Sequence, residues 1–145
     1  MELNAALQAA VWWSTILLLK LATFGPIVGF TRSKKKVVAS EEDAKFMGDG
    51  ATVSTSDPVV ERIRRAHLND MENIIPFIGL IFVYAISGAG DAGCVTLVSQ
   101  IFTAARFIHT VVYLGQVRQP ARALAFFTGL LCNVYMAVKV LLHLY

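Results

Sequence analysis

Residues 59–77 of this chain read VVERIRRAHLNDMENIIPF, and this stretch decides how the rest of the sequence is interpreted. Its first half is densely polar, but it continues into residues 77–86, which are apolar on every side. Because neither glycine nor proline lies between Val59 and Ile75, we expect a single helix to carry both halves. The uniformly apolar part, residues 74–86, has only thirteen residues and is too short to cross a bilayer alone. The polar turns before it are therefore expected to lie partly at membrane depth.

One face of this predicted helix carries a stripe of polar residues. Arg65, Asn69, Glu72 and Pro76 are spaced i, i+4, i+7 and i+11, which places them on the same side of a helix. A cation, an amide and a carboxylate at the mouth of a membrane helix are costly unless they interact with one another or with a ligand. The stripe is the first place to look for chemistry.

The composition is that of an integral membrane protein. Of the 145 residues, 56% are hydrophobic and 16% are charged, and the mean hydropathy is +0.60, whereas about a quarter of a soluble domain is charged. The apolar residues recur in four blocks, at about 5–31, 58–87, 94–115 and 120–145. Each block is long enough to cross about 30 Å of hydrocarbon as a helix. We therefore predict an all-α fold, with residues 1–145 forming one transmembrane domain built as an antiparallel, up-down four-helix bundle.

Residues 32–57 are the one long polar segment. A basic run is followed by an acidic run and then by a stretch rich in glycine, serine and threonine, which predicts a surface loop. Asp57 is suited to cap the next helix, and Pro58 to occupy its first position.

The distribution of basic residues predicts the orientation in the membrane. Ten of the thirteen lysines and arginines lie in the segments after the first and third blocks or in the turns that flank them. The other three are Lys20, Arg106 and Lys139. The positive-inside rule then places these segments in the cytoplasm and both termini on the opposite side.

Two cations lie inside predicted spans. Lys20 is expected either to pair with a carboxylate of a neighbouring helix or to extend to the interface. Arg106 shares one helix face with His109 and Tyr113, at i, i+3 and i+7. The two cysteines, Cys94 and Cys132, are expected to be buried free thiols, and no metal-ligand spacing is present, so we expect no metal.

The polar side chains expected near the cytoplasmic surface suit one kind of ligand. Asn69 and Glu72 offer partners for a peptide and an ammonium group, and an anionic peptide with two carboxylates and one amine would match the set. Glutathione is such a ligand, and its thiol has a pKa near that of cysteine, about 8.5. An arginine beside that sulfur at a helix N-terminus would favour the thiolate, and Arg122 lies in the first turn of the fourth span. The residues that offer donors to the carboxylates are Arg32, Arg64, Arg65, His67 and Arg122.

Each of these residues also has a simpler interpretation. Arg62, Arg64 and Arg65 would serve equally as a basic cluster that meets lipid headgroups. Glu72 and Arg106 would suit a purely structural ion pair within the membrane. The remaining simpler interpretations are interhelical hydrogen bonding for His109 and Tyr113, an interfacial position for His67, and lipid or core contacts for Phe126 and Phe127.

Four motifs resemble those of the MAPEG family, the membrane-associated proteins in eicosanoid and glutathione metabolism. They are residues 61–77, quoted above, together with 40–44 (SEEDA), 106–114 (RFIHTVVYL) and 119–127 (QPARALAFF). The resemblance spans nearly the whole chain and is strongest to the type-1 microsomal glutathione transferases and the inducible prostaglandin E synthases. It implies a four-helix subunit that assembles as a homotrimer, with glutathione bound between neighbouring subunits near the cytoplasmic face.

The resemblance also implies roles for individual residues. The positions that match the family's glutathione-binding residues are Arg32, Arg64, Arg65, His67, Asn69, Glu72, His109, Tyr113 and Arg122. Arg122 matches the arginine that stabilises the thiolate, and Asp43 matches a loop carboxylate associated with prostaglandin isomerisation; Arg106 and Phe126 are further candidates.

Three positions distinguish the two subfamilies. Leu68, Ala123 and Phe126 stand where the synthases have arginine, serine and tyrosine, which favours the transferase. Ala44 replaces a cysteine through which the vertebrate transferases are activated, so that mode of regulation is not expected here.

These observations predict a membrane-bound glutathione transferase of the endoplasmic reticulum, with the mitochondrial outer membrane as a second location. It would act on hydrophobic electrophiles from the bilayer, with glutathione peroxidase activity towards lipid hydroperoxides and no nucleic-acid partner. A glutathione-dependent prostaglandin-endoperoxide isomerase is the alternative enzyme. A non-catalytic lipid-binding scaffold is the alternative of another class, although a scaffold need not keep Arg65, Asn69, Glu72, Tyr113 and Arg122. A channel is disfavoured because most polar residues gather at one end of the spans.

Overall fold

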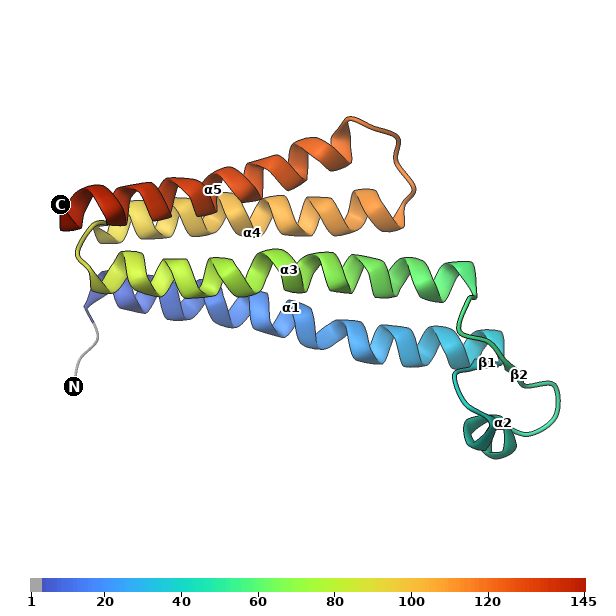
Figure 1. The fold of residues 1–145 in the computed structure, drawn as a ribbon. Coiled ribbons are helices and arrows are strands. Elements are labelled where there is room, and N and C mark those ends of the chain that lie inside the picture. Colours follow the sequence, from blue (N-terminus) through green and yellow to red (C-terminus); the bar gives the residue numbers. More distant parts are fainter. Residues whose placement is uncertain (1–3) are drawn as a thin grey trace.

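The computed structural model describes residues 4–145 and consists mainly of four long helices. These are α1 (Ala5–Lys35), α3 (Pro58–Ile86), α4 (Ala92–Leu114) and α5 (Ala121–Leu144). All four are long and apolar enough to cross a membrane. They lie side by side with α1 next to α3 and α4 next to α5, and the start of α1 is at the same end as the end of α5 (Figure 1). The all-α, up-down four-helix bundle expected from the sequence is confirmed.

The helix ends follow from the local sequence. The Asp57 carboxylate accepts hydrogen bonds from the backbone N–H groups of Val59 and Val60, and Pro58 occupies the first position of α3. Asp91 caps α4 in the same way by accepting from the N–H of Cys94 at 2.8 Å. Such caps satisfy N–H groups that a helix start leaves without partners.

The segment between α1 and α3 is more regular than the predicted surface loop. The first helix continues four residues past the expected end at Thr31, to Lys35, because basic side chains in a last turn interact favourably with the helix dipole. The segment also contains the short helix α2 (Glu41–Met47), capped by Ser40, and two two-residue strands, β1 (Val37–Val38) and β2 (Thr52–Val53), which pair in parallel. These elements lie beyond the end of the bundle opposite the start of α1 (Figure 1), which we call the loop end.

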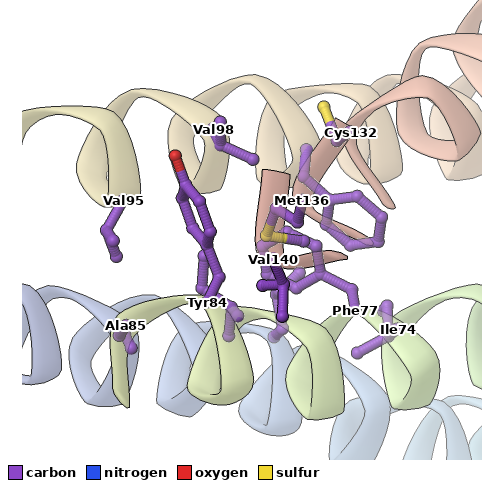
Figure 2. Packing of buried hydrophobic residues seen from close by; sticks show 13 residues of the cluster. Ile74, Phe77, Tyr84, Ala85, Val95, Val98, Cys132, Met136 and Val140 are labelled. Atoms are coloured by element: carbon purple, nitrogen blue, oxygen red, sulfur yellow. The ribbon is translucent and has the colours of Figure 1, made fainter. Parts of the chain in front are cut away.

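The core is formed where the four helices meet. Leu17 of α1, Phe77 of α3, Phe102 of α4 and Met136 of α5 are completely buried. The Phe77 and Phe102 rings stack with centroids 3.8 Å apart. Labelled side chains of α3, α4 and α5 point towards one another in this region of the core (Figure 2). In a membrane, lipid tails are as apolar as these side chains, so the hydrophobic effect does not drive the helices together. Close packing stabilises their association instead.

Candidate functional site

The largest of three neighbouring pockets lies at the loop end, between the start of α3, the end of α4 and the start of α5. Its volume is about 530 Å³. Arginines from two helices, α3 and α5, contribute to its wall together with Tyr113 of α4. The lining residues are Thr55, Ser56, Pro58, Glu61, Arg62, Arg65, Tyr113 and Arg122. Three guanidinium groups around one open pocket make it suitable for an anionic ligand.

Arg122 and Tyr113 stand between this pocket and a second one. The Arg122 guanidinium carbon lies 5.3 Å from the centre of the Tyr113 ring, a cation–π contact that orients the arginine. The second pocket, of about 380 Å³, combines polar groups with two phenylalanine rings. It is lined by Asn69, His109, Tyr113, Gln119, Arg122, Ala123, Phe126 and Phe127. An exposed cation thus lies between a cationic pocket and a partly aromatic one.

A buried polar cluster lies beside the second pocket. Arg106 donates to one oxygen of Asp70 through Nε at 3.0 Å and through Nη2 at 2.6 Å, and both residues are completely buried. Nη2 also donates to the Asn69 side-chain oxygen at 2.7 Å and faces His109 Nδ1 at 3.4 Å. Lys20 of α1 donates to the other Asp70 oxygen. The interior therefore holds Asn69 and His109 in place where they face the second pocket.

This cluster resolves two expectations from the sequence. Lys20 pairs with a carboxylate of a neighbouring helix, which confirms the first of its two interpretations. The simpler interpretation of Glu72 and Arg106, a structural ion pair between them, is wrong, because Arg106 pairs with Asp70 and Glu72 is exposed. The physical reason is helix geometry, because two residues along a helix are about 200° apart and only Asp70 faces the bundle interior.

The remaining predicted residues of α3 lie on its other side. Arg64 and His67 line a third pocket, of about 250 Å³, together with Leu68 and Met71. Arg64 is ion-paired with Glu61 at 2.6 Å, and His67 stacks on Phe24 of α1 with ring centroids 5.0 Å apart. Only Glu61 and Arg65 line both this pocket and the largest one.

Apart from the buried Arg106, three predicted residues line none of these pockets. Arg32, near the end of α1, donates to the Ser54 carbonyl oxygen at 3.2 Å and so ties the loop to the bundle. Asp43 is exposed on α2, beyond the end of the bundle, and Glu72 is exposed on α3. Within this chain, the predicted residues therefore form one connected group around Arg122 and several separate positions.

The edge of the largest pocket is fixed by an ion pair in the loop. Lys35 Nζ donates to the Asp57 carboxylate at 2.5 Å. This hydrogen bond, with those from the N–H groups of Val60 and Val59, holds the pKa of Asp57 below its ordinary value. Asp57 thus joins the end of α1 to the start of α3, directly beside Ser56 and Pro58 of the pocket wall.

Sequence reasoning missed Asp70 and Thr110, although a signal for Asp70 was present. Asp70 lies seven residues from both Ile63 and Phe77, so it falls on the apolar stripe that faces the core. A carboxylate on that stripe is the natural partner for the two cations, Lys20 and Arg106, within the spans. Thr110 joins the same cluster by donating to Asp70 at 3.1 Å.

Comparisons with known proteins identify relatives of this chain. The model of the MAPEG family matches residues 10–142. The chain is 40% identical to microsomal glutathione S-transferase 1 of Rattus norvegicus over 141 residues, which cover 95% of this chain and 90% of that protein. The human protein of the same name is 41% identical over 132 residues, covering 89% of this chain and 84% of its own length. Human prostaglandin E synthase is 40% identical over 138 residues, which cover 95% of this chain and 90% of that protein.

Proposed function

Since the chain belongs to the MAPEG family, we propose that it is a membrane-bound glutathione transferase. The observation that carries the proposal is the position of Arg122, which lines both the cationic pocket and the partly aromatic one. The first pocket suits the carboxylates of glutathione, and the second suits a hydrophobic electrophile. Relatives named microsomal glutathione S-transferase 1 support the same activity.

In the proposed reaction, Arg122 stabilises the glutathione thiolate. The guanidinium and the positive end of α5 both favour a negative charge on the sulfur, so the thiol loses its proton to solvent near neutral pH. The thiolate then attacks the electrophilic carbon: the sulfur–carbon bond forms as the carbon's bond to its leaving group breaks, and the leaving group departs with the electron pair. Arg65 and Tyr113 would hold the peptide during this step.

A homotrimer would complete the glutathione site. Arg64, His67 and Glu72 lie away from Arg122 on the same subunit, and Arg65 borders the pockets on both sides of α3. If a neighbouring subunit presents its Arg64 side towards the Arg122 pocket, the two partial pockets form one larger site. In this arrangement, all the predicted glutathione-binding residues of α3 would line a glutathione site.

The same proposal includes the cellular location. We place the protein in the endoplasmic reticulum membrane as a multi-pass protein, with the loop end in the cytoplasm because most basic residues lie there. Hydrophobic electrophiles and lipid hydroperoxides would reach the partly aromatic pocket laterally from the bilayer. Reduction of such hydroperoxides by glutathione is a second activity that the same thiolate would support, and a mitochondrial outer membrane pool would use the same site.

Prostaglandin-endoperoxide isomerase is the second candidate, favoured by the 40% identity to human prostaglandin E synthase. Two of the three positions that separate the subfamilies, Ala123 and Phe126, line the partly aromatic pocket. There, a methyl group and an unsubstituted ring replace the two hydroxyl groups that the synthases would offer. Asp43 is also distant from this pocket on α2. We therefore rank the transferase first.

The first experiment mixes purified protein with glutathione and follows thiolate absorbance near the ultraviolet edge at neutral pH. The transferase predicts a rapid rise in absorbance, followed by conjugate formation when a chlorodinitrobenzene is added. Binding without a thiolate signal would direct the work to a prostaglandin endoperoxide as substrate. If glutathione does not bind, the enzyme proposal fails and the scaffold alternative takes its place.

Mixed trimers test the shared site. Arg122→Ala and Glu72→Ala should each abolish most conjugation alone, and co-expression should restore part of it. Recovery is expected because some interfaces then combine an intact Arg122 from one subunit with an intact Glu72 from another. No recovery in proven mixed trimers would mean that each site lies within one subunit.

A further inference from the structure

The buried charges of the bundle do not balance. In the part of the chain that the structure describes, the formally charged residues among the buried ones are Lys20, Asp70 and Arg106. His109 is also buried, but its Nδ1 faces a guanidinium nitrogen that can only donate, so this ring nitrogen accepts and the imidazole is neutral. Two cations against one carboxylate leave one excess positive charge inside the membrane-spanning part of the bundle.

The surroundings of Lys20 favour its charged form. Its ammonium group donates to Asp70 and to the Thr110 hydroxyl oxygen at 2.8 Å. The ammonium nitrogen also lies 5.2 Å from the centre of the Phe24 ring and 5.5 Å from that of Phe107, within the range of cation–π attraction. A carboxylate, a hydroxyl and two aromatic rings all stabilise an ammonium more than a neutral amine. We therefore count Lys20 as a cation.

Lys20 and Arg106 share a single carboxylate, one at each oxygen. Lys20 occupies one oxygen of Asp70, and Arg106 occupies the other through two nitrogen atoms. Without Lys20, Asp70 would neutralise Arg106 alone. With Lys20 present, the guanidinium keeps a net positive field towards the groups on its other side.

That other side is the candidate site. Arg106 Nη2 contacts Asn69 and His109, and both line the pocket that Arg122 and Tyr113 also line. Arg122 and His109 line this same pocket. The charged and titratable groups that face this region are therefore Lys20 of α1, Asp70 of α3, Arg106, His109 and Tyr113 of α4, and Arg122 of α5.

We propose that Lys20 leaves the charge of Arg106 uncompensated and thereby favours the thiolate of glutathione bound at the site. This inference rests on the proposed transferase function and deepens it. Lys20 lines none of the pockets at the loop end. It acts through Asp70 and Arg106, so it is a positioning residue that supplies charge.

The test is a pH titration of the thiolate absorbance of enzyme-bound glutathione. Lys20→Met keeps much of the side-chain volume but reduces the cluster charge to zero. A unit charge about 10 Å away, in a medium with an effective dielectric constant of about 20, shifts a pKa by about one unit. We expect the pKa of the bound thiol to rise by about that amount. Lys139→Met, an exposed lysine of α5 near the opposite end of the bundle, is the matched control and should leave it unchanged.

A double variant separates charge from geometry. In Lys20→Met with Asp70→Asn, Arg106 is the one remaining charge of the cluster, so the net charge returns to that of the native protein. The bound thiol pKa should then return towards the native value, although more native contacts have been removed. A purely structural role for Lys20 predicts the opposite, a larger departure in the double variant.

Each outcome bears on the proposal. An unchanged thiol pKa in folded Lys20→Met, or no recovery in the double variant, overturns it. If Lys20→Met does not fold, Lys20→Gln, which can still donate to Asp70 without a charge, replaces it with the same expected shift. If the native protein shows no thiolate signal, the transferase proposal fails; if the native protein shows the signal and the variants do not shift it, the role of Lys20 alone fails.

Discussion

Replacing Asp70 by asparagine tests the polar interior most directly. The carboxylate accepts four hydrogen bonds, from Lys20 Nζ and the Thr110 hydroxyl on one oxygen and from Nε and Nη2 of Arg106 on the other. Asparagine preserves the shape but removes the negative charge and turns one acceptor into a donor. The variant leaves two buried cations without a counter-charge, with a donor facing one of them.

The expected loss of stability is large. Removing one partner of a buried ion pair costs about 3–5 kcal/mol, because the remaining charge stays buried without compensation. For a chain of this length, such a loss lowers the unfolding temperature by on the order of 10 °C. Thermal unfolding in detergent, followed by circular dichroism, measures it. Glu72→Gln is the matched control: it makes the same chemical change two residues along α3 on an exposed side chain, and a surface change of this kind costs about 0.5 kcal/mol or less.

Equal unfolding temperatures for Asp70→Asn and Glu72→Gln would refute this reasoning. So would a greater effect of Glu72→Gln, which would place the ion pair of Arg106 on the exposed side of α3. Adding Lys20→Met to Asp70→Asn should recover part of the stability, because one of the two uncompensated cations is removed. Such non-additivity is expected for groups that interact directly.

Three further predictions follow from the site and the turns. Arg122→Ala should lower the rate of conjugation by about 100-fold, the effect of removing one charge-stabilising donor, with glutathione affinity nearly unchanged. The control, Arg118→Ala in the preceding exposed turn, should leave the rate and the affinity unchanged in the same assay. Asp57→Asn keeps a capping oxygen but loses the charge. Because the folded pKa of Asp57 lies below its ordinary value of 3.8, the contribution of its charge to stability is present above that pH and is lost as the pH falls through the folded pKa. The free energy of unfolding should therefore decline less steeply below about pH 4 in the variant. Gly90→Ala should destabilise by about 1–3 kcal/mol because its methyl group would overlap a buried tyrosine ring, whereas Gly79→Ala in open space within α3 should stabilise by up to about 1 kcal/mol in urea or thermal unfolding.

The long helices were predictable because their signals are local. Asp57 and Pro58 mark the start of α3 within the sequence itself, and four apolar blocks of sufficient length leave few alternatives to a helical bundle. The pairing of Lys20 with a carboxylate was also foreseeable, since a lysine inside a span needs a partner or a route to water. The identity of that partner depends on which face of α3 meets α1 and α4.

The loop shows where sequence reasoning stops. The β1–β2 pair joins Val37 to Thr52 across a fifteen-residue separation, and strands of two residues carry no usable periodicity. The helix α2 did have a signal, Ser40 as a cap followed by acidic residues in the first turn, but its seven residues are too few to be stable without the loop around it. The conformation of this segment therefore depends on contacts between residues far apart in the sequence, not on local preference.

The distribution of site residues around α3 links the proposed ligand to the proposed assembly. Glu61 and Arg65 border two pockets, one shared with Arg122 and one with Arg64 and His67. The chain therefore presents two pockets built from the same two turns of one helix. Spacing along the sequence groups all these residues together, but it cannot distinguish one site used by one subunit from two half-sites used by neighbours.

If full activity persists in an isolated subunit, the pocket of Arg65, Tyr113 and Arg122 is sufficient for glutathione, and the other side of α3 serves only packing or lipid contact. If activity requires the trimer, the exposed polar face of α3 has its explanation in the neighbouring subunit.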